Sequence, residues 1–149
     1  MKKYSVRVDN KDNSIAVASA HDFSYKMSSE QGSVKNGINA AETLLSSLGI
    51  CLLTNLNSLS QKMHLNLKET YLEITGIRQA DPPKIVEIEV CFCFTSNEDD
   101  KKIQKLINLC VKYGTVTNTL MKSVKIKYKY NLRRINEKDS LLPNNGTIC

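Results

Sequence analysis

The hydrophobic repeat in the first half of the chain changes from a strand-like to a helix-like period. Residues 3–27 alternate between apolar and polar positions, which predicts two or three short strands. After a polar loop over residues 28–37, apolar residues recur at steps of three and four from Asn39 to His64. That spacing predicts one long helix, with Asn39 as its N-cap and Glu42 completing a capping box. The apolar stripe of this helix comprises Leu44, Leu48, Cys51, Leu52, Leu56, Leu59 and Met63.

The second half of the chain returns to strands around a second amphipathic helix. The order of elements predicts an α+β fold with an antiparallel sheet. Both helices are apolar enough to need cover on more than one side, which favours a homodimer. The predicted elements are strands over 67–77 and 85–95 around the turn Asp81-Pro82-Pro83, a helix from Ser96 or Asn97 to Gly114, a short helical piece over 118–122, and a final strand over 124–132.

The chain is long enough for one domain with its own core. Its 149 residues, 41% of them hydrophobic and 24% charged, are ordinary for a globular protein. We assign residues 1–134 to a single domain. Residues 135–149 include Pro143 and Gly146 without a hydrophobic repeat, so we expect a flexible C-terminal tail.

The net charge of +6 does not by itself indicate a nucleic-acid partner. The densest basic stretch, Lys122 to Arg134, alternates with Val124, Ile126, Tyr128 and Tyr130. This alternation is typical of a strand with one solvated face, so nucleic-acid binding is not expected.

Neither a membrane span nor an export signal is expected. No uninterrupted apolar run approaches the roughly 18 residues that span a bilayer, and the N-terminus lacks the apolar core of a signal peptide. We therefore expect a cytoplasmic protein, in which thiols are reduced by default.

Cys51, at the centre of the long predicted helix, is the main candidate for chemistry. Its place on the apolar stripe is compatible with a small buried hydrophobic residue. A reactive thiol would instead need a group that stabilises its thiolate. Cys51 is mid-helix, so its own helix dipole does not supply that group, and both interpretations stay open.

The other cysteines suggest packing. Cys91 and Cys93 are expected on the same face of one strand, and the only histidines, His21 and His64, are too few to complete a convincing metal site. Cys110 lies on the apolar face of the second predicted helix. We expect no metal and no cofactor.

Three segments together resemble the OsmC/Ohr family of peroxide-handling proteins, over about residues 22–132. Residues 42–51 (ETLLSSLGIC) are similar to the family pattern E-x-L-L-x-A-x-G-x-C. Residues 81–88 (DPPKIVEI) are similar to its D-P-P-x-x-x-x-I turn and strand. Residues 112–120 (KYGTVTNTL) are similar to its K-Y-C-x-V-x-x-x-L segment.

The resemblance implies an OsmC-like fold: an intertwined homodimer with antiparallel sheets enclosing two central helices. It implies a thiol-dependent peroxidase of organic or hydrogen peroxides, serving oxidative-stress defence. Cys51 would be the attacking cysteine, and Glu42 would be the family's carboxylate. A second cysteine then forms a disulfide, which a dithiol or a lipoyl protein reduces.

Two parts of the family's centre are missing from the sequence. Gly114 occupies the position of the second cysteine, so the resolving thiol would be Cys110, one helical turn earlier, or Cys149, or a small external thiol. The family's active-site arginine has no clear counterpart, since Arg7 is the only arginine before Cys51. The alternative is therefore a catalytically inactive dimer that binds a small hydrophobic ligand.

Overall fold

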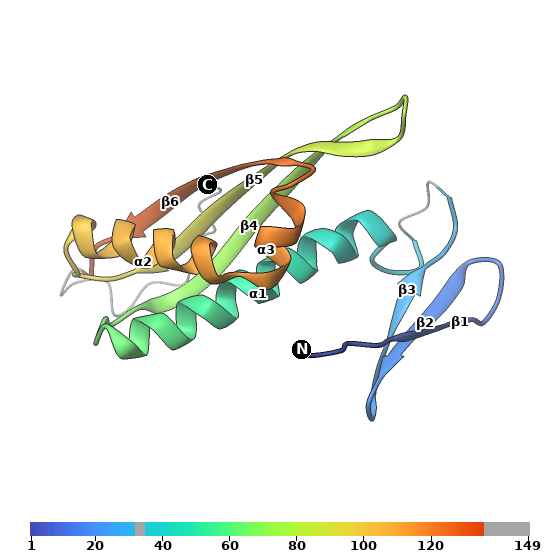
Figure 1. Ribbon diagram of the computed structural model, residues 1–149, viewed down its shortest axis with the longest axis horizontal. Coiled ribbons are helices and arrows are strands. Elements are labelled where there is room, and N and C mark those ends of the chain that lie inside the picture. Colours follow the sequence, from blue (N-terminus) through green and yellow to red (C-terminus); the bar gives the residue numbers. More distant parts are fainter. Residues whose placement is uncertain (32–34, 136–149) are drawn as a thin grey trace. The chain divides into compact units, whose positions relative to one another are not determined.

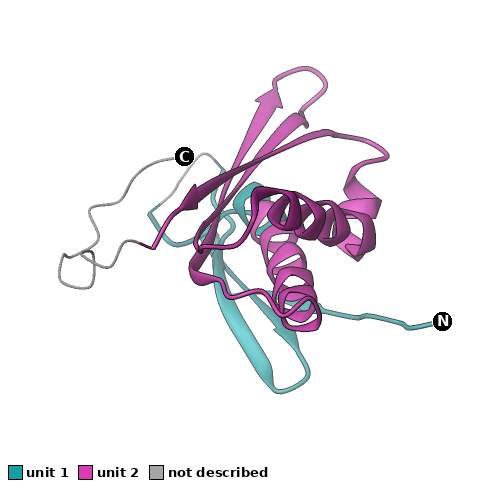
Figure 2. Ribbon diagram, turned by 90° about the vertical axis from the view of Figure 1, so that its left-hand side faces the viewer, with its two compact units in different colours: residues 1–44 teal, residues 45–149 magenta. Residues whose placement is uncertain are grey.

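The computed structural model describes residues 1–31 and 35–135, which form two compact units. Residues 1–44 make up unit 1 and residues 45–149 make up unit 2 (Figure 2). The elements run along the chain as β1 (Arg7–Asn10), β2 (Ile15–Ala20), β3 (Phe23–Ser28), α1 (Ala40–Lys62), β4 (Lys68–Gln79), β5 (Lys84–Thr95), α2 (Asp100–Tyr113), α3 (Thr115–Leu120) and β6 (Lys125–Arg133) (Figure 1). The α+β prediction is confirmed.

Unit 1 contains a small antiparallel sheet in the order β1-β2-β3. The turn between β1 and β2 is closed by the Asp12 carboxylate, which accepts hydrogen bonds from the backbone N–H groups of Ser14 and Ile15. This Asx-type turn explains why the polar residues 9–13 separate two strands. The three predicted short strands are therefore present.

Helix α1 begins at the capping box that the sequence predicts. The backbone N–H of Glu42 donates to Asn39 Oδ1 at 3.0 Å, and the backbone N–H of Asn39 donates to Glu42 Oε2 at 2.9 Å. This reciprocal pair satisfies two backbone donors at the start of the helix. It also gives the Glu42 carboxylate a structural task.

Unit 2 is built on a three-stranded sheet in the order β4-β5-β6. Strands β4 and β5 form an antiparallel hairpin, whereas β6 runs parallel to β5. The prediction of purely antiparallel sheets is therefore wrong for this pair. The chain leaves β5 at one end, returns through α2 and α3, and enters β6 at the opposite end, which is the connection that parallel strands require.

The helices of unit 2 cover one face of this sheet (Figure 1). Phe92 at the centre of β5 is fully buried, and the same face of the strand packs against the apolar stripes of α1 and α2. The alternation along β5 thus separates a core face from an outer face, as predicted. The buried cluster contains Leu48, Leu52, Leu56, Ile88, Val90, Phe92, Phe94, Ile103, Leu106, Ile107 and Cys110.

Helix α2 is capped later than the sequence predicts. Asp99, and not Ser96 or Asn97, is the N-cap, and its side chain accepts a hydrogen bond from the backbone N–H of Lys101. Ser96 is buried instead, and its hydroxyl donates to the carbonyl of Asn66. Gly114 ends the helix, as predicted.

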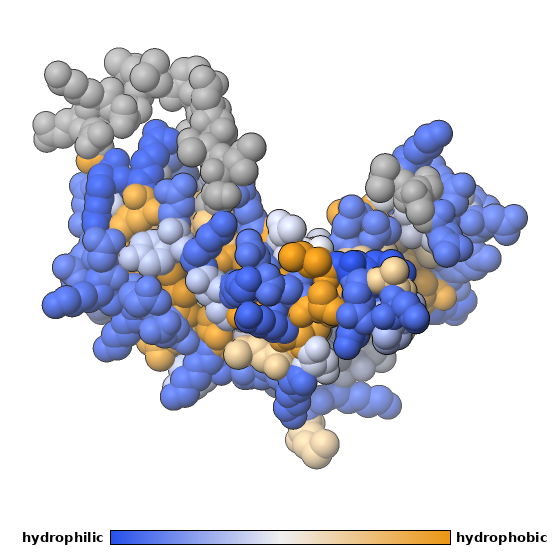
Figure 3. Space-filling view, turned by 90° about the horizontal axis from the view of Figure 1, so that it is seen from above, coloured by the Kyte–Doolittle hydropathy of each residue, from blue (hydrophilic) through white to orange (hydrophobic). Residues whose placement is uncertain are grey.

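Strand β6 has one solvated face, as the alternation in the basic stretch predicts. Lys125, Lys127 and Lys129 are exposed, while Ile126 and Tyr128 between them are partly buried. Lys125 and Lys127 form ion pairs with Glu87 on β5, and Lys127 also pairs with Glu89. Hydrophilic residues dominate the visible face in the space-filling view (Figure 3). Part of the basic charge is thus already compensated within the sheet.

Helix α1 is more apolar than expected from its short apolar runs. By length and composition alone it could cross a membrane, so the expectation that no segment meets that criterion is wrong. The difference arises because serine, threonine and glycine interrupt the apolar runs without making the helix strongly polar. Only 22% of its most apolar 18-residue window is buried in the single chain.

The predicted tail over 135–149 lies, beyond Ile135, outside the described residues.

Candidate functional site around Cys51

Cys51 is a free, partly buried thiol on α1. It lies between Leu48 and Leu52, which are fully buried, and Ile50, which is 67% exposed. The thiol therefore occupies the margin of the apolar stripe, where it is neither sealed in the core nor fully solvated. A thiol at such a margin is open to small reagents.

Gly114, at the junction of α2 and α3, lies directly against this thiol. A β-carbon on Gly114 would be 3.4 Å from Cys51 Sγ. It would also be 2.5 Å from Thr117 Oγ1 and 2.9 Å from Thr117 Cβ, which are closer than a β-carbon can come. Gly114 has φ −77° and ψ 119°, a conformation open to any residue. Glycine is therefore required here by the close approach of Thr117 and not by the backbone.

Two buried hydroxyl groups of unit 2 lack a hydrogen-bond partner. Thr117 Oγ1 and Tyr128 Oη are the buried side-chain oxygen or nitrogen atoms, among the described residues, that make no hydrogen bond. Thr117 is fully buried on α3, and Tyr128 projects from β6 toward the core. Such unsatisfied groups are rare, and each costs about 1–3 kcal/mol of stability.

The electrostatics of Tyr128 tie it to the same site. Burial, and then the negative charge of the Cys51 thiolate, raise the pKa of Tyr128 to about 12. Tyr128 therefore keeps its proton at neutral pH and is available as a hydrogen-bond donor. Its ring packs beside Phe92, with centroids 6.5 Å apart, which fixes its position on the sheet.

Cys110, the candidate resolving thiol, lies in the core on α2. Its side chain is fully buried, and burial raises the pKa of the Cys110 thiol to about 12. The backbone carbonyl of Cys110 accepts a hydrogen bond from Asn55 Nδ2 at 3.0 Å, which ties the last turn of α2 to α1. These features favour a packing role, because an attacking thiol needs both access and thiolate character.

Glu42 and Cys51 lie on the same helix but on opposite sides of it. Nine residues of a regular α-helix correspond to about 13.5 Å along the axis and to half a turn. Within one helix, the carboxylate and the thiol therefore do not face a common site. Glu42 serves the capping box described above.

Arg7 is engaged within its own sheet. Its guanidinium forms an exposed ion pair with the Asp9 carboxylate at 2.7 Å on β1. The candidate site within unit 2 therefore consists of the Cys51 thiol, the backbone of Gly114 and the hydroxyls of Thr117 and Tyr128.

Cys91 and Cys93 lie side by side on the outer face of β5. Their sulfur atoms are 3.7 Å apart, and each residue is 3% exposed. They share one face, as predicted, and both are buried. In the described ranges, no three histidine, cysteine, aspartate or glutamate residues converge on a point that could hold a metal ion.

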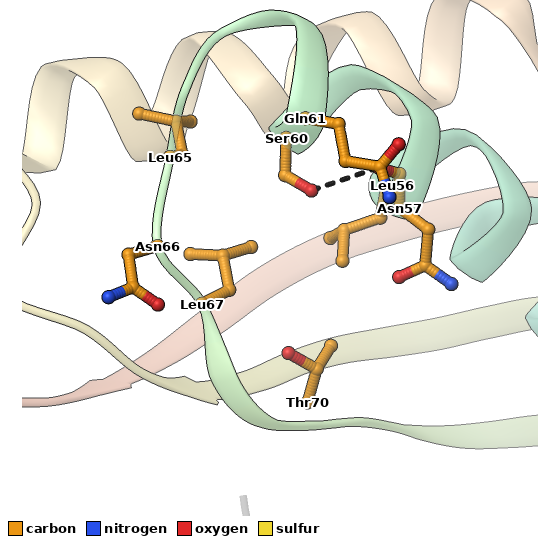
Figure 4. A pocket seen from close by; sticks show the side chains of 8 residues that line it. All are labelled: Leu56, Asn57, Ser60, Gln61, Leu65, Asn66, Leu67 and Thr70. Atoms are coloured by element: carbon orange, nitrogen blue, oxygen red, sulfur yellow. Dashed lines mark hydrogen bonds between the residues drawn. The ribbon is translucent and has the colours of Figure 1, made fainter.

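A pocket of about 330 Å³ lies near the C-terminal end of α1, away from Cys51 (Figure 4). The connection to β4 bounds it, and His64 and Glu69 there have positive φ angles of 54° and 48°. Amide, hydroxyl and leucine side chains line the pocket: Leu56, Asn57, Ser60, Gln61, Leu65, Asn66, Leu67 and Thr70. No sequence pattern predicts this cavity, because its walls are ordinary residues from separate elements.

Thr117 and Tyr128 were also missed by sequence reasoning. The sequence pattern places Tyr128 only on the apolar side of a strand, and Thr117 only within a segment that resembles the family. The sequence offers a weak signal for Thr117, since it follows Gly114 by one helical turn and so faces the same neighbour.

Comparisons with known proteins agree with this fold. The family described as OsmC-like protein matches residues 30–129. No curated protein matches the sequence at a significant level. An OsmC-like protein from Mycoplasma pneumoniae has a similar structure, with a TM-score of 0.82, 22% identity, and coverage of 89% of this chain and 98% of that chain.

Two further similar structures are of organic hydroperoxide resistance proteins. The protein OhrB of Bacillus subtilis superposes with a TM-score of 0.61 at 12% identity, over 87% of this chain and 98% of that chain. The OsmC protein of Legionella pneumophila superposes with a TM-score of 0.65 at 11% identity, over 88% and 98% of the two chains. At these identities the likeness supports the fold. The match over residues 30–129, which covers most of the chain, shows that the protein belongs to the OsmC-like family.

Proposed function

We propose that the protein is a thiol-dependent peroxidase that reduces organic or hydrogen peroxides at Cys51. The observation that carries this proposal is the contact between Cys51 and residue 114: a β-carbon there would be 3.4 Å from the thiol sulfur. In the family pattern, residue 114 is the second cysteine, so Cys51 has the neighbour expected of the attacking thiol. The names of the two hydroperoxide resistance proteins support the same class of reaction.

In the proposed reaction, the Cys51 thiolate attacks one peroxide oxygen. A sulfur–oxygen bond forms and the oxygen–oxygen bond breaks, so the sulfur is oxidised by two electrons to a sulfenic acid. The departing alkoxide of an organic peroxide, or the hydroxide of hydrogen peroxide, takes up a proton and leaves as an alcohol or as water. The peroxide supplies the oxidising equivalents.

The sulfenic acid is then reduced by a thiol from outside the site. Gly114 supplies no thiol, and the buried, protonated Cys110 reaches Cys51 only if the end of α2 rearranges. An external dithiol or lipoyl group attacks the sulfenic sulfur, which forms a mixed disulfide and releases water. The second thiol of the reductant then releases Cys51 and closes its own disulfide.

A homodimer is part of this proposal. The apolar surface of α1 that the single chain leaves uncovered includes Ile50 and Leu44, which are 67% and 38% exposed. A second copy would cover this surface. Because Glu42 is half a turn away from Cys51 on its own helix, we assign its carboxylate to the partner's thiol, where it would hold a cation or position the peroxide. We place the dimer in the cytoplasm, where external thiols are reduced.

Steady-state peroxide consumption tests the proposal. Purified protein is given cumene hydroperoxide or hydrogen peroxide together with dithiothreitol or dihydrolipoamide, and peroxide loss is followed. Catalysis is expected in the wild type and in Cys110→Ala, and it should be absent in Cys51→Ser. Equal consumption by Cys51→Ser and wild type would contradict the proposal.

The second candidate is a catalytically inactive dimer that binds a small hydrophobic ligand. It is favoured by the loss of the second thiol at Gly114 and by the partly apolar 330 Å³ pocket beside Leu56, Leu65 and Leu67. Its test is binding of the apolar probe 1-anilinonaphthalene-8-sulfonate. Binding that is lost when Thr70→Trp fills the pocket, in a protein with an unreactive Cys51, would favour this candidate over the peroxidase.

A further inference from the structure

The hydroxyls of Thr117 and Tyr128 lack partners in the part of the core that surrounds Cys51. Among the described residues, they are the buried side-chain polar atoms without a hydrogen bond. Thr117 lies against residue 114, which contacts the Cys51 sulfur, and Tyr128 packs against the core cluster that includes Leu48 and Leu52 on α1. The two hydroxyls come from different elements, α3 and β6, and therefore share no local sequence cause. Buried hydroxyls normally find a partner within the protein, so two of them in the part of the core around a thiol point to a partner that arrives during function.

The Thr117 hydroxyl and the Cys51 sulfur both lie against residue 114. A β-carbon on Gly114 would be 2.5 Å from Thr117 Oγ1 and 3.4 Å from Cys51 Sγ. The two atoms are therefore at most the sum of these distances apart, about 6 Å. An oxygen carried by the Cys51 sulfur can accept a hydrogen bond of about 2.8 Å from the hydroxyl when the two atoms lie well inside this limit.

Both hydroxyls have the right chemistry to donate to such an oxygen. Threonine and protonated tyrosine each carry one O–H donor, and the raised pKa of Tyr128 keeps its proton in place. Donors that are fixed in a partly dry site stabilise charge that develops on a reacting oxygen. They also hold a sulfenic acid in place once it has formed.

The Thr117 hydroxyl and a side chain at position 114 exclude each other. A β-carbon on Gly114 would clash with Thr117 Oγ1. A second cysteine at this position could not coexist with the hydroxyl where it now lies. The chain thus has a hydroxyl donor where a disulfide partner would otherwise approach Cys51.

We propose that Thr117 and Tyr128 donate hydrogen bonds to the oxygen atom on Cys51, first as the peroxide reacts and then in the sulfenic acid. The inference rests on the proposed peroxidase function and extends it. The site is built to keep a long-lived sulfenic acid, which a small external thiol reduces directly. The hydroxyls add no redox equivalents, because the peroxide oxidises the sulfur and the external thiol reduces it.

The test compares Thr117→Val, Tyr128→Phe and the double variant with wild type. Thr119→Val and Tyr130→Phe are matched controls. Thr119 is exposed on the same helix, and Tyr130 lies two residues along the same face of β6 with its hydroxyl near Asp100. Three quantities are measured on the full chain: the rate of Cys51 oxidation by cumene hydroperoxide, the sulfenic acid's lifetime by dimedone trapping, and the urea midpoint of the reduced protein.

Oxidation in the Thr117 and Tyr128 variants is expected to be about tenfold slower or more. Their sulfenic acid should be shorter-lived and should pass more readily to sulfinic acid in excess peroxide. Their reduced forms should be as stable as wild type or more stable, because an unsatisfied hydroxyl has been removed. The controls should match wild type in oxidation rate and in sulfenic acid lifetime, and their reduced forms should lose some stability with the hydrogen bonds of Thr119 and Tyr130.

The two proposals fail in different ways. If wild-type Cys51 is not oxidised at all, the peroxidase function is wrong and this inference falls with it. If wild type is oxidised and the variants match it in rate and lifetime, only the role of the hydroxyls is wrong. A clear loss of stability in the reduced variants would also overturn the inference, since it would show that the hydroxyls already have partners.

Discussion

The backbone of Gly114 lies against the thiol of Cys51, so that a β-carbon on Gly114 would be 3.4 Å from the Cys51 sulfur. This contact joins the centre of α1 to the junction of α2 and α3. The contact is present although residue 114 carries no thiol. The Thr117 side chain occupies the space that a side chain at position 114 would need. We therefore propose that Cys51 reacts with peroxide and that an external thiol reduces the oxidised Cys51.

Gly114→Cys should form a disulfide with Cys51 under mild oxidation. An S–S bond of about 2.05 Å leaves the β-carbon of one cysteine roughly 3 Å from the other sulfur, close to the 3.4 Å found here. The reduced variant should lose about 1–3 kcal/mol of stability, because the new β-carbon overlaps Thr117. Peptide mapping without reductant and urea unfolding measure the two effects.

Gly76→Cys is the matched control for this substitution. A β-carbon there would meet the flexible end of the Leu45 side chain at 3.2 and 3.3 Å, and Ile85 Cγ2 at an ordinary contact distance of 3.6 Å. It should be tolerated better and should not pair with Cys51. Failure of Cys51 to pair with a cysteine at position 114, in a folded protein, would show that the contact is not maintained in solution.

The start of α1 and the strand periods could be predicted because they depend on neighbouring residues. The capping box of Asn39 and Glu42 is complete within four positions. The parallel direction of β6 could not be predicted, because the alternation of Lys127 and Tyr128 is the same in parallel and antiparallel strands. For a similar reason, only part of the site could be predicted from the sequence. Cys51 stands out by its residue type, whereas an unpartnered Thr117 hydroxyl is evident only once every neighbour has been placed.

Stability should fall at alkaline pH partly through Cys110. Burial raises the pKa of the Cys110 thiol from 9.0 to about 12. Between these values the unfolded chain loses this proton while the folded protein keeps it, so the free energy of unfolding decreases as pH rises from about 9 to about 12. The slope is at most about 1.4 kcal/mol per pH unit.

Urea unfolding from pH 8 to pH 11 measures this slope in wild type and in Cys110→Ala. The variant should be less stable at pH 8, because it leaves a small cavity, but its stability should decline less steeply. Tyr128→Phe provides a second comparison, since the pKa of Tyr128 is also raised to about 12. Parallel slopes in wild type and Cys110→Ala would contradict a buried, protonated thiol.

Ile50→Glu should disrupt the proposed dimer without unfolding the chain. Ile50 is 67% exposed on α1, so the single chain tolerates a charge there. In a dimer that covers this face, an unpaired carboxylate would be buried, and the dissociation constant should rise by about 100-fold or more. Analytical ultracentrifugation measures the change. Lys105→Glu, on an exposed position of α2, is the control. A dimer unaffected by Ile50→Glu would place the interface elsewhere.

Glu42→Gln separates the two roles of this residue. Glutamine can also close a capping box, so the stability of α1 should be nearly unchanged. If the carboxylate acts on the partner's thiol or peroxide through its charge, oxidation of Cys51 should slow by about tenfold. Stopped-flow measurement of the first oxidation step tests this, with Glu30→Gln as an exposed control. An unchanged rate would leave Glu42 with capping alone.

The most direct test of the account is the chemical fate of Cys51 after a single turnover. Reduced protein is exposed to one equivalent of cumene hydroperoxide, with and without dimedone, and analysed by intact-protein and peptide mass spectrometry. We expect a dimedone adduct on Cys51 within seconds, and no adduct on Cys110. A Cys51 that remains unmodified after minutes of exposure would contradict this expectation and would leave the thiol as a packing residue of α1.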